Sequence, residues 1–202
     1  LDLFGLDHNW LIYADICKDE FSVCFTQSWA ENIAYVWNLP SDGSVRTGYY
    51  QKFSPTGIGC RIEEVRHYFY DWGEPNVFAE DVECWVYYDV GGVPGTTPVA
   101  QVIIPTTDMV YFPAPTVVDF TPYNVLFDVP VWVGVEKYHT APAGIVTMLS
   151  DDGFGVPDQG AVHYVDDAGT VDEWLILSDL GGGWDHNFVM DADICCIPPE
   201  ER

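Results

Sequence analysis

Two clusters of acidic residues have the composition of a calcium site. Both lie in turns that contain glycine, and their carboxylates belong to Asp151, Asp152, Asp166, Asp167, Asp172 and Glu173. Calcium takes six to eight oxygen ligands, and such loops supply carboxylates and backbone carbonyls together. Neither cluster has the spacing of an EF-hand loop, and adjacent aspartates also occur in plain solvated turns. The clusters are therefore candidate Ca2+ sites, with a solvated turn as the alternative.

The chain as a whole is strongly acidic. It carries 32 Asp and Glu against 7 Lys and Arg, a formal net charge of -25, while 48% of its residues are hydrophobic. This apolar content suffices for a packed core, so the carboxylates must lie on the surface of a folded domain. With so few cations, nucleic acid and anionic lipid are excluded as partners. No apolar run approaches the length of a membrane-spanning helix.

Signatures of common enzymes are absent from the sequence. It contains no GxSxG, HExxH or P-loop motif and no GxGxxG that follows a strand. The five His are scattered: His67 falls in an alternating strand and fits the core, whereas His186 follows Asp185 near a glycine-rich turn and is a candidate ligand. We therefore predict that the protein is not an enzyme.

Aromatic residues suggest a binding role instead. The chain has 8 Trp, 12 Tyr and 11 Phe, and Trp72, Trp132 and Trp184 lie near turns or at alternating positions where their rings could be exposed. Exposed rings on a β-sandwich can stack on sugars. The alternative is that these aromatics fill the core or a subunit interface, since each can bury a large apolar area.

The cysteines indicate disulfides in an exported protein. They are Cys17, Cys24, Cys60, Cys84, Cys195 and Cys196, without a CxxC pair or a His at zinc spacing. A hairpin could join Cys17 to Cys24. Adjacent side chains on a strand point to opposite faces, so Cys195 and Cys196 could reach different partners among Cys60 and Cys84. Buried free thiols are the alternative.

Period-two alternation of apolar residues predicts strands and no long helix. It is clearest in residues 64–70, 131–136 and 188–194, and short runs rich in β-branched and aromatic residues follow the same trend at 82–88, 99–104, 116–120, 145–149, 162–165 and 174–177. Turn clusters of Gly, Pro and Asp separate them. The predicted fold is an all-β antiparallel β-sandwich, with a jelly roll as its topology.

The first 45 residues alternate less regularly than the rest. We expect residues 1–45 to form an N-terminal extension and residues 46–202 to form the β-sandwich domain. The extension could complete the sandwich of its own chain or lie as an added strand against a neighbouring subunit. A start at Leu1, without Met or a basic leader, is expected for a mature, exported chain.

One hairpin resembles a known type of module. The run from Trp85 to Thr96 contains Asp89, Gly91, Gly92, Pro94 and Gly95 in a D-x-GG-x-PG-T pattern, and a return strand follows at 99–102. This run is similar to the jelly-roll modules of secreted bacterial surface proteins, which often lie next to C-terminal anchoring or sorting signals. The likeness covers roughly residues 49 to 196 and implies a non-catalytic role. The alternative is that the pattern only reflects the formation of a turn, since Gly permits positive φ and Pro fixes the adjacent corner.

These observations together predict a non-catalytic, extracellular or cell-surface structural protein. It would self-associate into a filament or layer through aromatic and apolar contacts, because its carboxylates must avoid such contacts or be neutralised by cations. The alternative is a carbohydrate-binding module of a secreted protein, which would have a glycan as its partner.

Overall fold

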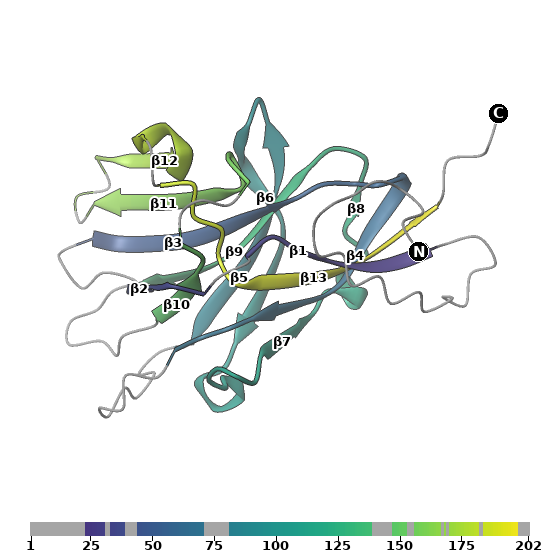
Figure 1. Ribbon diagram of the computed structural model, residues 1–202, viewed down its shortest axis with the longest axis horizontal. Coiled ribbons are helices and arrows are strands. Elements are labelled where there is room, and N and C mark those ends of the chain that lie inside the picture. The colour runs from purple at the N-terminus through teal and green to yellow at the C-terminus, as the bar shows by residue number, and fades with distance from the viewer. Residues whose placement is uncertain are drawn as a thin grey trace.

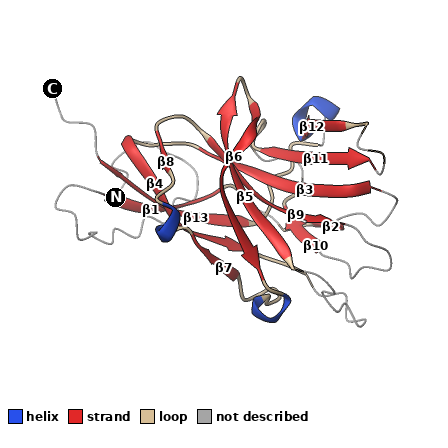
Figure 2. Ribbon diagram, turned by 180° about the vertical axis from the view of Figure 1, so that it is seen from behind, coloured by secondary structure: helices blue, strands red, loops and turns tan. Residues whose placement is uncertain are grey.

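The computed structural model describes residues 23–30, 33–38, 44–70, 81–138, 147–152, 156–166, 168, 170–181 and 184–197. Most of these residues are in strands (Figure 1), and the helical elements among them are short 3-10 turns (Figure 2). The turns are η1 (Thr106–Asp108), η2 (Thr121–Tyr123) and η3 (Leu177–Leu180). Within this described part, no helix is long and apolar enough to cross a membrane.

The described strands form antiparallel sheets, which confirms the predicted all-β sandwich. One sheet has the order β1 (Val23–Ser28), β13 (Met190–Ile197), β4 (Ile58–His67) and β7 (Thr116–Asp119), with β8 (Leu126–Phe127) also paired to β4. The second has the order β12 (Asp172–Ile176), β11 (Gly160–Asp166), β3 (Ser44–Phe53), β9 (Val131–Tyr138), β5 (Val82–Val90) and β6 (Val93–Ile104). A two-stranded sheet pairs β2 (Tyr35–Asn38) with β10 (Thr147–Ser150). In Figure 1, β12, β11 and β3 lie side by side, as do β13 and β1.

The main hydrophobic core takes buried side chains from both large sheets. The alternation predicted around β4 is observed: Val65, His67 and Phe69 are fully buried, whereas Glu64 and Arg66 remain partly exposed. Burying one face of each sheet against the other removes apolar surface from water, which is the main force that stabilises a sandwich.

A second aromatic cluster covers the opposite face of the six-stranded sheet. Its buried members are Tyr50, Tyr87, Trp132, Ala161 and Ile176, with Trp85 and Trp174 packed against them. The Cα atoms of the edge strands β12 and β6 come within 8 Å of each other, so the sheet curls around this cluster. Gly134 of β9 leaves room for the Tyr50 ring, since a Cβ there would lie 2.6 Å from the ring and 2.1 Å from the Tyr49 oxygen.

A buried histidine joins three strands within this second cluster. His163 of β11 contacts Glu136 Oε1 of β9 through Nδ1 at 3.0 Å and Asp172 Oδ1 of β12 through Nε2 at 2.8 Å. Its ring stacks on Trp174 at 4.1 Å between centroids. Burial lowers the pKa of His163, but the hydrogen bonds and charges of the two carboxylates outweigh burial and raise it overall. The edge strand β12 is thereby tied to the centre of the sheet.

The aspartate of the D-x-GG turn, Asp89, has two structural roles in the β5–β6 hairpin. Gly91 and Gly92 have φ of +69° and +96°, values that favour glycine. Asp89 Oδ2 accepts a hydrogen bond from the Gly92 amide at 3.1 Å, and Oδ1 accepts one from Trp132 Nε1 at 2.8 Å. The aspartate therefore fixes both the turn and a buried tryptophan.

Strands from the expected N-terminal extension belong to the sandwich of their own chain. β1 pairs with β13, and β2 pairs with β10. For the strands β1 and β2, this pairing corresponds to the first of the two alternatives, completion of the sheets of the same chain. Residues 1–22 lie outside the described residues.

Two disulfides tie the C-terminal strand to both of its neighbours. Cys24 of β1 bonds to Cys195, and Cys60 of β4 bonds to the adjacent Cys196. The predicted pair of Cys17 and Cys24 is wrong, because antiparallel pairing of β1 with β13 sets Cys24 directly opposite Cys195. Cys17 itself lies outside the described residues.

Cys84 has a free thiol, so its predicted disulfide to Cys195 or Cys196 is wrong. It lies on β5, in the opposite sheet from β13, and is fully buried in the core. Its Sγ contacts His67 Nε2 at 3.2 Å. Burial raises the pKa of the thiol, which disfavours the reactive thiolate.

We therefore expect Cys84 to resist alkylation by iodoacetamide in the native protein and to react after unfolding in guanidinium. Peptide mass spectrometry of native and unfolded samples measures this difference. Complete labelling of Cys84 under native conditions would contradict the observed burial.

Candidate functional site

Two exposed aromatic rings flank a buried histidine at the two-stranded sheet. Tyr35 of β2 is 53% exposed and Trp184 is 43% exposed, whereas His186 between them is only 5% exposed. The His186 ring centroid lies 5.0 Å from that of Tyr35 and 6.0 Å from that of Trp184. Trp37 packs edge-on against both His186 and Trp184. We call this group the Tyr35–Trp184 site.

The strands position these rings by pairing. Tyr35 and Trp37 are two residues apart on β2, where the pairing partners are Ser150 and Met148 of β10. An isolated antiparallel bridge between Ser150 and Phe188 then brings the segment of Trp184 and His186 alongside β10. Three segments far apart in the sequence thus meet at one surface.

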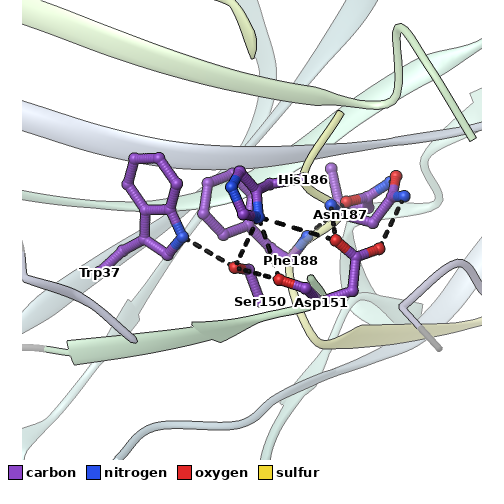
Figure 3. A network of polar contacts seen from close by, with 7 residues as sticks. Trp37, Ser150, Asp151, His186, Asn187 and Phe188 are labelled. Atoms are coloured by element: carbon purple, nitrogen blue, oxygen red, sulfur yellow. Dashed lines mark hydrogen bonds and ion pairs between the residues drawn. The ribbon is translucent and has the colours of Figure 1, made fainter. Parts of the chain in front are cut away.

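Hydrogen bonds beneath the rings fix the orientation of His186 (Figure 3). Nδ1 of His186 lies 3.0 Å from the Asp151 carbonyl oxygen and 3.4 Å from Ser150 Oγ. A carbonyl oxygen can only accept, so Nδ1 carries a proton; in the neutral form of an imidazole with this tautomer, Nε2 is an acceptor. Trp37 Nε1 donates to the same Ser150 Oγ at 2.8 Å. The imidazole therefore has one assigned tautomer.

A buried polar network holds the adjoining backbone. The Asp151 carboxylate accepts hydrogen bonds from the Asn187 amide at 3.0 Å and from Asn187 Nδ2 at 2.9 Å. Gln51 of β3 donates to Asn187 Oδ1 at 3.2 Å and accepts from the Phe188 amide at 2.8 Å. A satisfied buried network of this kind is rigid. The network therefore holds in place the backbone that carries His186 and Trp184.

Ser150, His186 and Asp151 have the residue types of a hydrolase triad but a different geometry. In a triad the serine bonds to one imidazole nitrogen and the carboxylate to the other. Here both Ser150 Oγ and Asp151 face Nδ1, and the Ser150 hydroxyl donates to the Asp151 carbonyl oxygen at 3.2 Å. The group orients the histidine and does not activate the serine.

The carboxylates predicted to bind calcium differ in their burial and in their hydrogen-bond partners. Asp151 is buried in the network above, and Asp152 is half-buried beside it. Asp166 closes a turn by accepting hydrogen bonds from the Thr170 side chain and from the Thr170 and Val171 amides, which lower its pKa. Asp172 Oδ1 lies 2.8 Å from Nε2 of His163.

Glu173 is exposed, and Asp167 lies outside the described residues. Across the described ranges, no group of three or more His, Cys, Asp or Glu is placed to hold a metal ion. The calcium site stays a prediction, which thermal melting with and without a chelator would test.

The tryptophans predicted to stack on sugars are divided between core and surface. Trp132 is fully buried in the second aromatic cluster, with Lys52 Nζ 4.9 Å from its ring centroid, so the prediction of an exposed ring is wrong there. Curling of the sheet covers that face. Trp72 lies outside the described residues. Trp184 is at the surface, and the neighbouring Tyr35 and Trp37 were not predicted for the site.

Comparison with known proteins identifies the fold. No family model matches the chain, and a search of curated proteins finds no match. A solved structure of the clostridial cysteine protease Cwp84 after propeptide cleavage aligns with 86% of this chain and 40% of its own, at 13% identity and a TM-score of 0.58.

A second structure contains the cysteine protease and lectin-like domains of Cwp84, a surface layer associated protein of Clostridium difficile. It aligns with 80% of this chain and 36% of its own, at 14% identity and a TM-score of 0.53. The chain thus spans less than half the length of these structures. At such identities the likeness establishes a shared fold.

Proposed function

We propose that this chain is a glycan-binding module of an extracellular or cell-surface protein. The observation that carries the proposal is the Tyr35–Trp184 site, where two exposed rings flank a buried imidazole of fixed orientation. Aromatic rings offer a rigid apolar surface to the C–H faces of a sugar, and a few convergent polar groups select its hydroxyls. A hydroxyl of the bound sugar would donate to Nε2 of His186.

The structural neighbours support this assignment by their architecture. One of them contains lectin-like domains beside its protease domain, and the all-strand character of the described residues leads us to infer that the match falls on the lectin-like portion. Two disulfides are typical of proteins that fold in an oxidising compartment, which supports placement outside the cell.

Removal of either exposed ring is expected to weaken glycan binding by at least about tenfold, because each ring supplies a large part of the stacking surface. A glycan array would identify a ligand for the wild type. Isothermal titration with that ligand would then compare wild type, Tyr35→Ala and Trp184→Ala.

Tyr123 and Phe112 serve as matched controls, since they are 48% and 44% exposed and lie outside the site. Their alanine variants should bind as the wild type does, and all four variants should melt cooperatively. Equal losses in the control variants, or full binding by both site variants, would refute the proposal.

The structural, self-associating role stays a prediction, as does the likeness to sorting-linked jelly-roll modules. Sedimentation velocity with and without Ca2+ would test the self-association directly. Polymers that form through the Tyr35–Trp184 surface would compete with glycan for the same rings.

A further inference from the structure

Ser150 of β10 lies between the two segments that carry the exposed rings. It pairs with Tyr35 of β2 on one side and with Phe188 on the other, and its carbonyl oxygen accepts a hydrogen bond from the Ala34 amide at 3.0 Å. Its side chain is fully buried, so it takes no part in the surface that a ligand would contact. A single buried residue is thus joined to both segments of the Tyr35–Trp184 site.

The Ser150 hydroxyl is engaged on all sides (Figure 3). It donates to the Asp151 carbonyl oxygen at 3.2 Å and accepts from Trp37 Nε1 at 2.8 Å, and Nδ1 of His186 lies 3.4 Å from the same Oγ. A hydroxyl has one proton and two lone pairs. The carbonyl oxygen therefore uses the proton, and the indole N–H is held by a lone pair. Removing the hydroxyl would leave that N–H without its acceptor.

Trp37 connects this hydroxyl to the exposed ring of Trp184. The Trp37 ring meets that of Trp184 edge-on, with 6.0 Å between centroids, and it packs on Tyr49 and Phe188 of the main core at 5.9 and 5.8 Å. Edge-on contacts depend on the relative orientation of the rings. The hydrogen bond to Ser150 fixes the orientation of the indole, and the indole in turn supports Trp184.

We propose that Ser150 is a positioning residue of the Tyr35–Trp184 site. Its hydroxyl fixes the Trp37 indole, and Trp37 holds the Trp184 ring in the orientation that stacks on a sugar. A ring that is already held in place loses less entropy when a ligand binds, so the free site is preorganised. This inference rests on the proposed glycan-binding function, and Ser150 acts in it through Trp37 without touching the ligand.

Ser150→Ala tests the inference, because it keeps every ring and removes the hydroxyl alone. Isothermal titration of the full chain would use cellohexaose, the hexamer of N-acetylglucosamine and the tightest ligand found on a glycan array. We expect Ser150→Ala to weaken binding about fivefold, the effect of one lost hydrogen bond. The titrations are made well below the melting temperature of each variant.

NMR of the free protein supplies a readout that does not depend on any ligand. The indole 1H–15N signal of Trp37 is identified by its absence from the spectrum of Trp37→Phe. In Ser150→Ala this signal should shift and its proton should exchange faster with water, and the Trp184 indole signal should shift as well. Unchanged indole signals for both tryptophans would overturn the inference.

A double-mutant cycle assigns the effect to Trp37. Trp37→Phe removes the N–H donor and retains an apolar ring, so Ser150→Ala should change the affinity by less than about twofold in that background. A full further loss there would show that Ser150 acts through His186 or the backbone, which contradicts the inference.

Thr116→Val is the matched control for general destabilisation. It removes a hydroxyl that is similarly buried, at 2% exposed, from β7 of the other sheet, where Thr116 bonds to the backbone of Val110. Its glycan affinity and its Trp37 signal should match those of the wild type. An equal loss of affinity in this control would overturn the inference.

The outcomes separate this inference from the proposed function. If the wild type and Ser150→Ala bind a glycan equally well, Ser150 has no positioning role and glycan binding stands. If the wild type binds neither hexasaccharide nor any sugar on the array, the proposed function and the inference are both overturned.

Discussion

Loss of the Cys60–Cys196 disulfide in the double variant Cys60→Ala, Cys196→Ala is expected to lower the free energy of unfolding by about 3 to 5 kcal/mol. The bond closes a loop across 136 residues, and cross-linking so long a loop strongly restricts the unfolded chain. It also holds β13 against β4, the pairing that completes the centre of the five-stranded sheet. Guanidinium denaturation followed by tryptophan fluorescence measures the change.

Cys84→Ala is the matched control for this variant. Cys84 is also fully buried but has a free thiol, so its replacement removes packing and the contact of Sγ with His67 Nε2 but no cross-link. We expect that variant to lose about 1 kcal/mol. A loss in Cys84→Ala as large as that in the double variant would show that packing, and not the cross-link, accounts for the effect.

Acid is expected to destabilise the protein through His67. Burial lowers the pKa of this side chain from 6.5 to about 3, and its Nδ1 is buried without a hydrogen-bond partner among the described residues. Between these two values the unfolded chain binds a proton that the native state does not. The free energy of unfolding therefore falls as the pH drops through this window, by about 5 kcal/mol at the lower end.

His67→Gln removes the titrating group from the core and should flatten the dependence between pH 6.5 and about pH 3. His163→Gln is a contrasting control, because the folded-state pKa of His163 is raised. Its contribution is present below pH 6.5 and is lost as the pH rises through the folded-state value. Parallel stability curves for wild type and His67→Gln would contradict the assignment to His67.

Much of the fold follows from the alternation of apolar residues, but β3 shows where that signal fails. Tyr49, Tyr50, Gln51 and Phe53 are all buried, because the main core covers one face and the second aromatic cluster covers the other. A strand buried on both faces has no period-two pattern. In the first 45 residues the described strands β1 and β2 are short, and each pairs with a strand that is distant in the sequence.

The candidate site could be predicted only in pieces. His186 and Trp184 were identified as a candidate ligand and a candidate stacking residue from their place near a glycine-rich turn. Trp37 and Ser150 are 113 residues apart in the sequence, and only the pairing of β2 with β10 brings them together. Gln51 offered no signal, since a lone glutamine is compatible with any exposed position.

The disulfide pairing also could not be predicted from the sequence alone. Proximity in sequence favoured Cys17 with Cys24, whereas the register of β1 against β13 selects Cys195 at a separation of 171 residues. Register depends on the whole sheet, so spacing along the chain does not reveal it.

The central claim is that His186 contacts a glycan bound between Tyr35 and Trp184. Imidazole 15N NMR of the native protein, recorded with and without the glycan found by array, tests it most directly. The hydrogen bond to Asp151 predicts a proton on Nδ1 of His186 and a glycan-dependent shift of the Nε2 resonance. A proton on Nε2 in the free protein, or an Nε2 resonance that stays fixed at saturating glycan, would contradict the claim.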